Sequence, residues 1–115
     1  MPLRIVEQEI TKTGLKELAQ ERFGDMVKAV VDTERNIMAV GGELHSDEEA
    51  LLLESGSKQE NLWGINFYPD VTGEEWIEFD SMINIRPSQG NRSRGVEDEE
   101  TRKMIVALVN KLVRL

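Results

Sequence analysis

The residues most able to do chemistry gather in the stretch Arg86-Pro-Ser-Gln-Gly-Asn-Arg-Ser-Arg94-Gly. Between Met82 and Val96 the chain holds three arginines and no acidic residue, although its net charge is −8. A guanidinium offers a planar fork of donors suited to phosphate or carboxylate, and glycines let backbone N–H groups approach an anion. The pattern predicts a binding loop for an anionic, phosphate- or nucleotide-like ligand. Its expected ligand-binding residues are Arg86, Gln89, Asn91, Arg92 and Arg94.

A purely structural role for the same arginines is the competing interpretation. They could pair with nearby acids, either in the run Glu97 to Glu100 or at Glu78 and Asp80. The loop is not a Walker A motif, because Val96 stands where that motif requires lysine.

A second candidate site follows Gly41-Gly42. If a strand continues through these glycines, Glu43 and His45 point to the same face. Asp80 could then complete a small divalent-metal site with mixed nitrogen and oxygen ligands. This alternative predicts a metal-assisted hydrolase or nuclease. A lone histidine beside acids is more often an exposed or hydrogen-bonded loop residue.

A third candidate is the polar face of the strand expected around residue 80. The residues on this face are Glu78, Asp80, Asn84 and Arg86, with Asn66 added from the preceding strand. Two carboxylates two residues apart could share a proton or hold a metal, and the arginine could position a polar ligand. The alternative is a solvent-facing sheet surface with cross-strand ion pairs.

Local patterns predict the elements that must position these side chains. A short strand is expected at Leu3–Glu7, followed by a helix that Thr11 caps and Gly24 ends. Two strands, Val27–Asp32 and Ile37–Gly42, flank a polar connection that suits a hairpin.

The following segment is ambiguous. Ser46 and Glu49 could form a capping box ahead of a short helix, but the three leucines in Ala50–Leu53 also suit a buried strand, which we favour slightly. Further strands are expected at Leu62–Tyr68 and at Trp76–Arg86, the second with Ile77, Phe79, Ile83 and Ile85 on one face. A closing helix is expected from about Asp98 to Val113.

Short connections between these elements favour antiparallel neighbours. The expected fold is therefore α+β: one domain over residues 1–115, with a mainly antiparallel sheet of about five strands and an N-terminal and a C-terminal helix packed on one face.

Composition excludes several kinds of site. The chain has no cysteine and one histidine, which rules out disulfides, thiolate nucleophiles, cysteine-based zinc sites and multi-histidine metal sites. Its 22 acidic residues against 14 basic ones oppose nonspecific nucleic-acid binding. No particular cofactor is indicated.

The same sequence gives expectations about location and assembly. The longest apolar run, Met104–Val109, is too short to span a membrane, and the pattern of a signal peptide is missing, so we expect a cytoplasmic protein. A third functional class is a structural or interaction protein that forms a homodimer through an edge strand or an apolar helix face.

Several stretches resemble a family of small uncharacterised prokaryotic proteins. They are Val27–Asp32, Gly41–His45, Leu62–Asn66 and Trp76–Gly95, so the likeness covers nearly the whole chain. That family is a domain of unknown function with no assigned activity. The resemblance implies a standalone cytoplasmic domain, and no catalytic or binding residue can be carried over from it.

Overall fold

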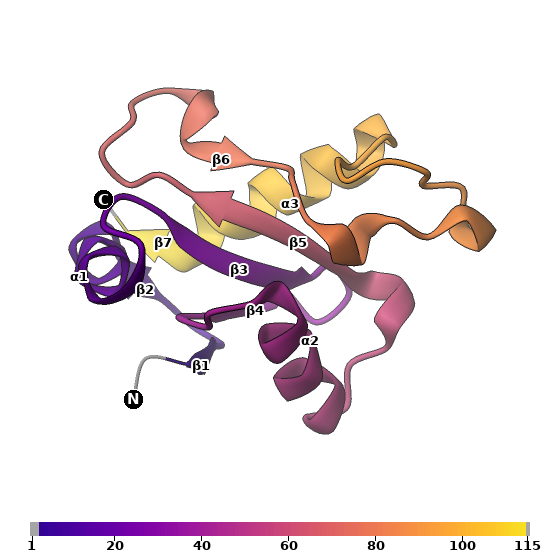
Figure 1. The fold of residues 1–115 in the computed structure, drawn as a ribbon, viewed down its shortest axis with the longest axis horizontal. Helices are drawn as coiled ribbons and strands as arrows, with labels where there is room; N and C mark the ends of the chain where they lie inside the picture. The colour runs from indigo at the N-terminus through magenta and orange to yellow at the C-terminus, as the bar shows by residue number, and fades with distance from the viewer. Residues whose placement is uncertain (1–2, 115) are drawn as a thin grey trace.

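The computed structural model describes residues 3–114 and has an α+β fold with one five-stranded antiparallel sheet and three helices (Figure 1). The strand order in this sheet is β1-β4-β3-β5-β6. The strands are β1 (Arg4–Val6), β3 (Val27–Asp32), β4 (Ile37–Val40), β5 (Leu62–Phe67) and β6 (Ile77–Glu78). A separate parallel pair joins β2 (Ile10–Thr11) to β7 (Val113–Arg114). The helices are α1 (Lys12–Arg22), α2 (His45–Glu54) and α3 (Glu99–Leu112).

The predicted caps of α1 are confirmed. The Thr11 Oγ1 atom accepts a hydrogen bond from the Gly14 backbone N–H at 2.9 Å, which satisfies one unpaired donor of the first turn. Gly24 follows the helix with a φ of +91°, a conformation that glycine adopts without strain. Its N–H donates to the Ala19 carbonyl at 2.6 Å and closes the helix.

The predicted hairpin between β3 and β4 is also confirmed, and β3 has the expected bounds. The Asp32 Oδ1 atom accepts from the backbone N–H groups of Glu34 and Arg35, at 2.9 and 3.0 Å. Asn36 then takes a left-handed φ of 56°, which asparagine tolerates better than most residues. These local bonds turn the chain from β3 into β4.

The strand favoured at Ala50–Leu53 is wrong, because this segment lies inside α2. Successive residues of a helix point about 100° apart, so three consecutive leucines cannot share one environment. Leu52 is fully buried, Leu51 is half-buried and Leu53 is 41% exposed. The N-cap is Leu44, which makes no side-chain cap bond, so the capping box expected at Ser46 and Glu49 does not form.

The long strand expected at Trp76–Arg86 is wrong beyond its first residues. Only Ile77–Glu78 pairs with β5, and two 3-10 turns, Met82–Asn84 and Pro87–Gln89, follow. The Asn84 side chain takes the place of a neighbouring strand: its Oδ1 accepts from the Gly64 N–H at 2.8 Å and its Nδ2 donates to the Gly64 carbonyl at 3.0 Å.

This short strand also breaks the predicted apolar face. Ile77 and Phe79 contribute to the main core, whereas Ile83 packs in a smaller cluster and Ile85 is 38% exposed. Gly64 permits the turn to approach, because a Cβ at this position would lie 2.5 Å from the Cβ of Ser81.

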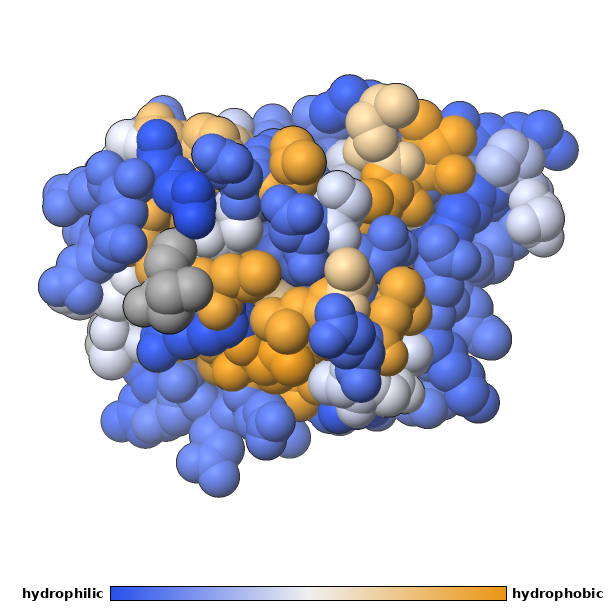
Figure 2. All heavy atoms as spheres, turned by 60° about the horizontal axis from the view of Figure 1, so that its bottom comes forward, coloured by the Kyte–Doolittle hydropathy of each residue, from blue (hydrophilic) through white to orange (hydrophobic). Residues whose placement is uncertain are grey.

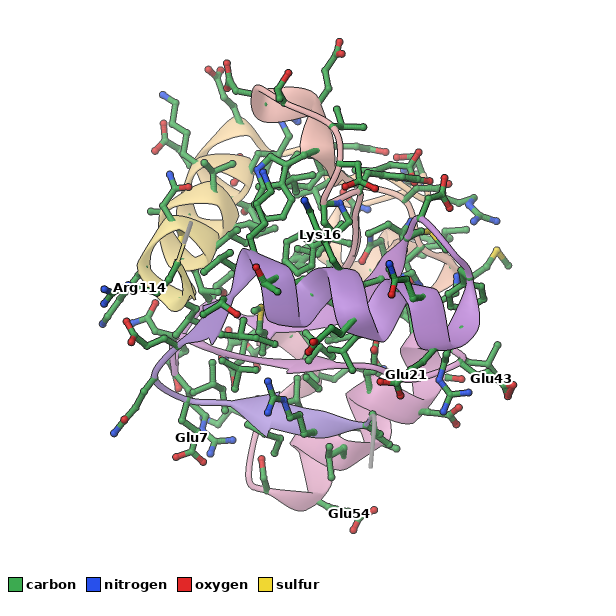
Figure 3. The ribbon with its side chains drawn as sticks, turned by 90° about the vertical axis from the view of Figure 1, so that its left-hand side faces the viewer. Glu7, Lys16, Glu21, Glu43, Glu54 and Arg114 are labelled. Carbon is green, nitrogen blue, oxygen red and sulfur yellow. The ribbon has the colours of Figure 1, made fainter. Side chains whose placement is uncertain are left out.

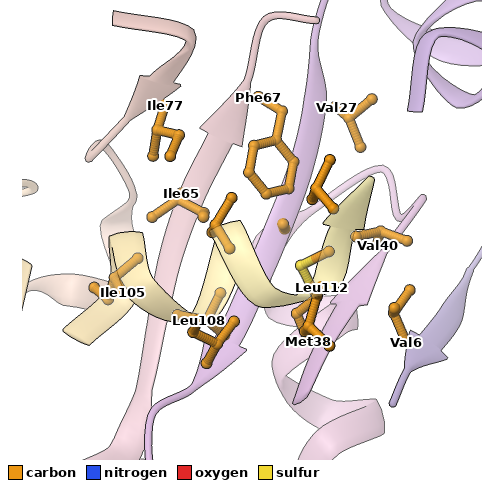
Figure 4. Packing of buried hydrophobic residues seen from close by; sticks show 14 of the residues in the cluster. Val6, Val27, Met38, Val40, Ile65, Phe67, Ile77, Ile105, Leu108 and Leu112 are labelled. Atoms are coloured by element: carbon orange, nitrogen blue, oxygen red, sulfur yellow. The ribbon is translucent and has the colours of Figure 1, made fainter. Parts of the chain in front are cut away.

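The core is divided between the two faces of the sheet. The larger cluster combines one face of β3, β4 and β5 with α1 and α3, as the packing around Phe67, Met38 and Leu112 illustrates (Figure 4). The smaller cluster lies on the opposite face and joins Val30 and Leu62 to Leu52 of α2. The prediction of two helices on one face therefore missed the helix that covers part of the other.

The N-terminal helix differs from the expectation in its position. Leu15 and Ala19 of α1 share the larger cluster with α3, but α1 lies at one end of the sheet, beside β2 (Figure 1, Figure 3). None of the helices within residues 3–114 is long and apolar enough to cross a membrane.

Candidate functional site

A row of polar side chains crosses three strands of the sheet. Lys28 of β3 pairs in register with Asn66 of β5, and Asn66 pairs in register with Glu78 of β6. Side chains alternate along a strand, so Lys28 projects to the same face as Val30, which packs against α2. On this face helix α2 packs against β3 and β4, and the turn Met82–Asn84 packs against β5.

Asn66 lies at the centre of the row and is only 4% exposed. Its Nδ2 donates to Glu78 Oε1 at 2.9 Å and to the Asp80 carbonyl at 3.2 Å. Both partners are acceptors, so the end of the amide that faces Glu78 and the Asp80 carbonyl is the nitrogen. The Oδ1 atom is buried and has no hydrogen-bond partner among the described residues.

His45, the first residue of α2, lies over the same face of the sheet. It is 8% exposed, and its Nε2 lies 2.8 Å from the Ile65 carbonyl oxygen. Because a carbonyl can only accept, Nε2 carries the proton and Nδ1 of the neutral ring is an acceptor. Burial lowers the pKa of His45; the bond to the Ile65 carbonyl and the neighbouring Asn66 side chain oppose this effect, and the charge of Lys28 lowers the pKa further. The imidazole is therefore neutral at neutral pH.

The β6 side of the site is held by hydrogen bonds and one ion pair. The Tyr68 hydroxyl donates to Glu78 Oε1 at 3.2 Å, and burial together with this carboxylate raises the pKa of Tyr68. Arg94 Nε forms an ion pair with Asp80 Oδ1, and both side chains are partly exposed. We call the whole set the polar face: Lys28, His45, Asn66, Tyr68, Glu78, Asp80 and Arg94.

Glu48 lies one turn along α2 from His45 and is fully buried. Its Oε2 accepts from the Gly42 N–H at 2.9 Å, while its Oε1 has no partner among the described residues. Burial raises the pKa of Glu48 to about 9, so the side chain is protonated at neutral pH. Gly42 is needed for this contact, since a Cβ there would lie 2.9 Å from Glu48 Cγ.

The loop predicted to bind an anion uses two of its side chains to anchor itself. Arg86 Nη2 donates to the Leu62 carbonyl at 2.6 Å, and its guanidinium lies over the Trp63 ring, 4.3 Å from the centroid. Gln89 Nε2 donates to the Glu60 carbonyl at 2.7 Å. These contacts tie the loop to the start of β5.

Asn91 organises the rest of that loop from inside. It is 4% exposed, and its Nδ2 donates to the carbonyls of Asn84 and Gly95, both at 2.8 Å. Its Oδ1 accepts from the Glu97 N–H at 2.9 Å. The structure does not bring the three arginines together: Arg86 faces the start of β5, and Arg94 faces Asp80.

The residues of the predicted metal site are placed apart. Glu43 is at the surface near the C-terminal end of α1 (Figure 3), where it pairs with Arg22 at 3.6 Å. His45 faces the sheet and bonds to Ile65, while Asp80 pairs with Arg94. Within residues 3–114 no three histidine, aspartate or glutamate side chains are grouped closely enough to hold a metal ion.

The polar face thus combines parts of all three candidates predicted from sequence. His45 and Asp80 come from the second, Asn66 and Glu78 from the third, and Arg94 from the loop. Sequence reasoning missed Lys28, Tyr68 and Glu48. The one available signal was Lys28, a single charge between apolar residues of a predicted strand, but finding its neighbours needs the register of β3 with β5.

The family model described as "Protein of unknown function (DUF5674)" matches residues 4–112, and the chain belongs to this family. Comparison with curated proteins gave no significant match, and neither did comparison with solved structures. The family confirms the resemblance of the sequence, and it assigns no activity to any residue.

Proposed function

We propose that this member of the DUF5674 family is a binding module for a small anionic molecule, and that the ligand binds on the polar face. The observation that carries the proposal is the polar row Lys28–Asn66–Glu78, in which the central side chain, Asn66, is buried and its Oδ1 has no hydrogen-bond partner among the described residues. Buried polar atoms are nearly always paired, so the Asn66 oxygen calls for an explanation, and a bound ligand is the one proposed here.

Two cations are available to hold the anionic group. Lys28 is half-buried, and Arg94 is 54% exposed. The bond from Arg94 to Asp80 uses Nε, which leaves the two Nη groups to bind a carboxylate or phosphate. This version of the anion-binding prediction retains Arg94 from the loop and assigns Arg86, Gln89 and Asn91 to holding the loop in place.

The proposal predicts different effects for two neighbouring arginines. The wild-type protein would be screened by thermal unfolding against nucleotides, phosphorylated metabolites and small carboxylates, amino acids among them. A ligand at 100 times its Kd raises the free energy of unfolding by about 2.7 kcal/mol, and the resulting increase in Tm is readily measured. Lys28→Met and Arg94→Ala should remove the shift, whereas Arg92→Ala should keep it.

Arg92→Ala is the matched control, because Arg92 belongs to the same loop and its side chain forms no ion pair with any of residues 3–114. Loss of the shift in Arg92→Ala with its retention in Arg94→Ala would contradict the proposal and favour a site on the exposed loop. Equal shifts in all variants would place binding elsewhere.

The other two functions stay predictions. Metal-assisted hydrolysis through Glu43, His45 and Asp80 would require metal in the purified protein that His45→Ala removes. A homo-oligomeric interaction protein would show self-association in solution. Cytoplasmic location is likewise still a prediction.

A further inference from the structure

We infer that a second binding site lies along α3 and binds a carboxylic acid with an elongated apolar body. Two cavities adjoin there, of about 420 and 450 Å³, and Asn110 of α3 lines both. Cavities of this size are typical of small-molecule sites. We call the two together the α3 groove. No residue of the polar face lines it, so the inference does not depend on the proposed function.

One side of α3 forms one wall of this groove along the length of the helix. Its residues recur at steps of three or four, which places them in one row on the helix surface: Glu99, Lys103, Val106, Asn110 and Val113. The facing wall includes Trp76 and Phe79, on either side of β6. Val106 and Val113 are seven residues apart, so the apolar part of the groove extends over about 10 Å.

The apolar surface of the groove is held in place by the core. The Trp76 ring stacks on the fully buried ring of Phe67, with centroids 4.9 Å apart and an interplanar angle of 20°. Phe79 and Val106 are half-buried and pack against the larger core cluster. A ligand with an apolar body would therefore cover a surface that is already ordered, which lowers the entropic cost of binding.

Lys12 supplies a positive charge at one end of the groove. It lines the cavity of about 420 Å³, and its Nζ lies 4.8 Å from the centroid of the Trp76 ring. Lys12 forms no ion pair with any of residues 3–114. A single ammonium balances one negative charge, and the net charge of the chain is −8, so a monocarboxylate suits this end better than a phosphate dianion. The Asn110 amide offers a neutral donor beside it.

The other end of the groove does not favour a second acidic group. Lys103 forms ion pairs with glutamates one turn back on α3, including Glu99 at 3.7 Å. Arg102 Nη1 donates to two backbone carbonyls of the preceding loop, at 2.5 and 3.0 Å. The carboxylates of Glu74 and Glu99 also line this end. The ligand therefore lies with its acid at Lys12 and its apolar body along the helix.

The test uses octanoate and three relatives that each change one property. Octan-1-ol keeps the chain without the charge, acetate keeps the acid without the chain, and suberate adds a carboxylate at the far end. Each would be titrated into the intact protein and followed in a ¹⁵N spectrum at the Trp76 indole and the Asn110 side-chain amide.

Octanoate should bind at least about fivefold more tightly than octan-1-ol or suberate, because a charge-assisted hydrogen bond is stronger than a neutral one. Acetate should cause no measurable shift. Octan-1-ol is the more hydrophobic of the pair, so simple association with apolar surface would give the opposite order.

Three variants locate the acid. Lys12→Met keeps an apolar side chain over Trp76 and removes the charge, so it should abolish the preference for octanoate over octan-1-ol. Asn110→Glu adds a carboxylate at an exposed helix position between the two cavities, and should weaken octanoate while leaving octan-1-ol unchanged. Lys111→Met is the matched control, because Lys111 is exposed and lines a different cavity, beside Met104. It should bind both probes like the wild type.

Three results would overturn the inference. Octan-1-ol could bind as tightly as octanoate, which would leave no role for the acid. Lys12→Met and Lys111→Met could weaken octanoate equally, which would show an effect of net charge alone. Octanoate could shift Lys28 and the Asn66 amide and leave Trp76 unmoved, which would support the polar face and not the α3 groove.

Discussion

Three side chains around the start of α2 are buried and uncharged at neutral pH. His45 has a lowered pKa, Glu48 has a pKa of about 9, and Asn66 cannot ionise. Two of them, Glu48 and Asn66, also have an oxygen without a partner among the described residues. The protein thus keeps polar groups in a poorly hydrated place, which lowers stability and suits a site that binds a ligand.

Glu48 gives a pH prediction. Its pKa is about 9 in the folded chain and 4.5 ordinarily, so the folded state holds the proton more tightly than the unfolded state. The contribution of this tighter proton binding to the free energy of unfolding is fully present below pH 4.5 and is lost as pH rises toward 9. Glu48→Gln keeps an acceptor for Gly42 and cannot ionise. The Tm difference between Glu48→Gln and wild type should therefore grow in favour of the variant from pH 5 to pH 9.

Glu54→Gln serves as the control, because Glu54 is exposed on the same helix. Its Tm should follow that of the wild type at every pH. A constant difference between Glu48→Gln and wild type across this range would contradict a protonated Glu48 in the folded protein.

At the scale of elements, α2 covers part of one sheet face through a single fully buried leucine. Leu52→Ala should reduce the free energy of unfolding by about 2–5 kcal/mol, because it opens a cavity against Val30 and Leu62. Leu53→Ala removes a side chain that is 41% exposed and should cost less than about 1 kcal/mol. Urea denaturation measures both values, and similar losses would show that the segment is not packed as this helix.

The loop after β6 depends on buried amides rather than on its arginines. Asn91→Ala leaves the Asn84 and Gly95 carbonyls and the Glu97 N–H without this partner. It should lower the free energy of unfolding by about 1–3 kcal/mol or more. Arg92→Ala, one residue away and exposed, should change stability by less than about 0.5 kcal/mol. Equal urea midpoints for the two variants would contradict an anchoring role for Asn91.

At the scale of the molecule, local signals were sufficient for some elements and not for others. The caps of α1 and the turn at Asp32 follow from contacts within a few residues, and both were predicted correctly. The end of β6 depends on Asn84 bonding to Gly64, twenty positions earlier, and no local pattern reveals that bond. The polar face needs the register of three strands, which explains why its members were found in separate candidates and Lys28 was missed.

Self-association through the sheet edge also belongs to this scale. Strand β1 is at one edge of the sheet, and Figure 2 shows apolar surface on the side where β1 and α2 come forward. Ile5 and Leu51 are half-buried there and pack on the smaller cluster. Sedimentation at increasing concentration would detect a dimer, and the net charge of −8 implies that any association should strengthen with salt.

The most direct test of the polar face is a ¹⁵N spectrum of the assigned wild-type protein titrated with the ligand panel. We expect the largest shifts at Lys28, at the Asn66 side-chain amide and at Arg94 Nε, with Arg86 and Arg92 little changed. Shifts centred on Arg86 and Arg92, with the Asn66 amide signals unmoved, would contradict this account and would place the binding site in the loop of residues 86–95.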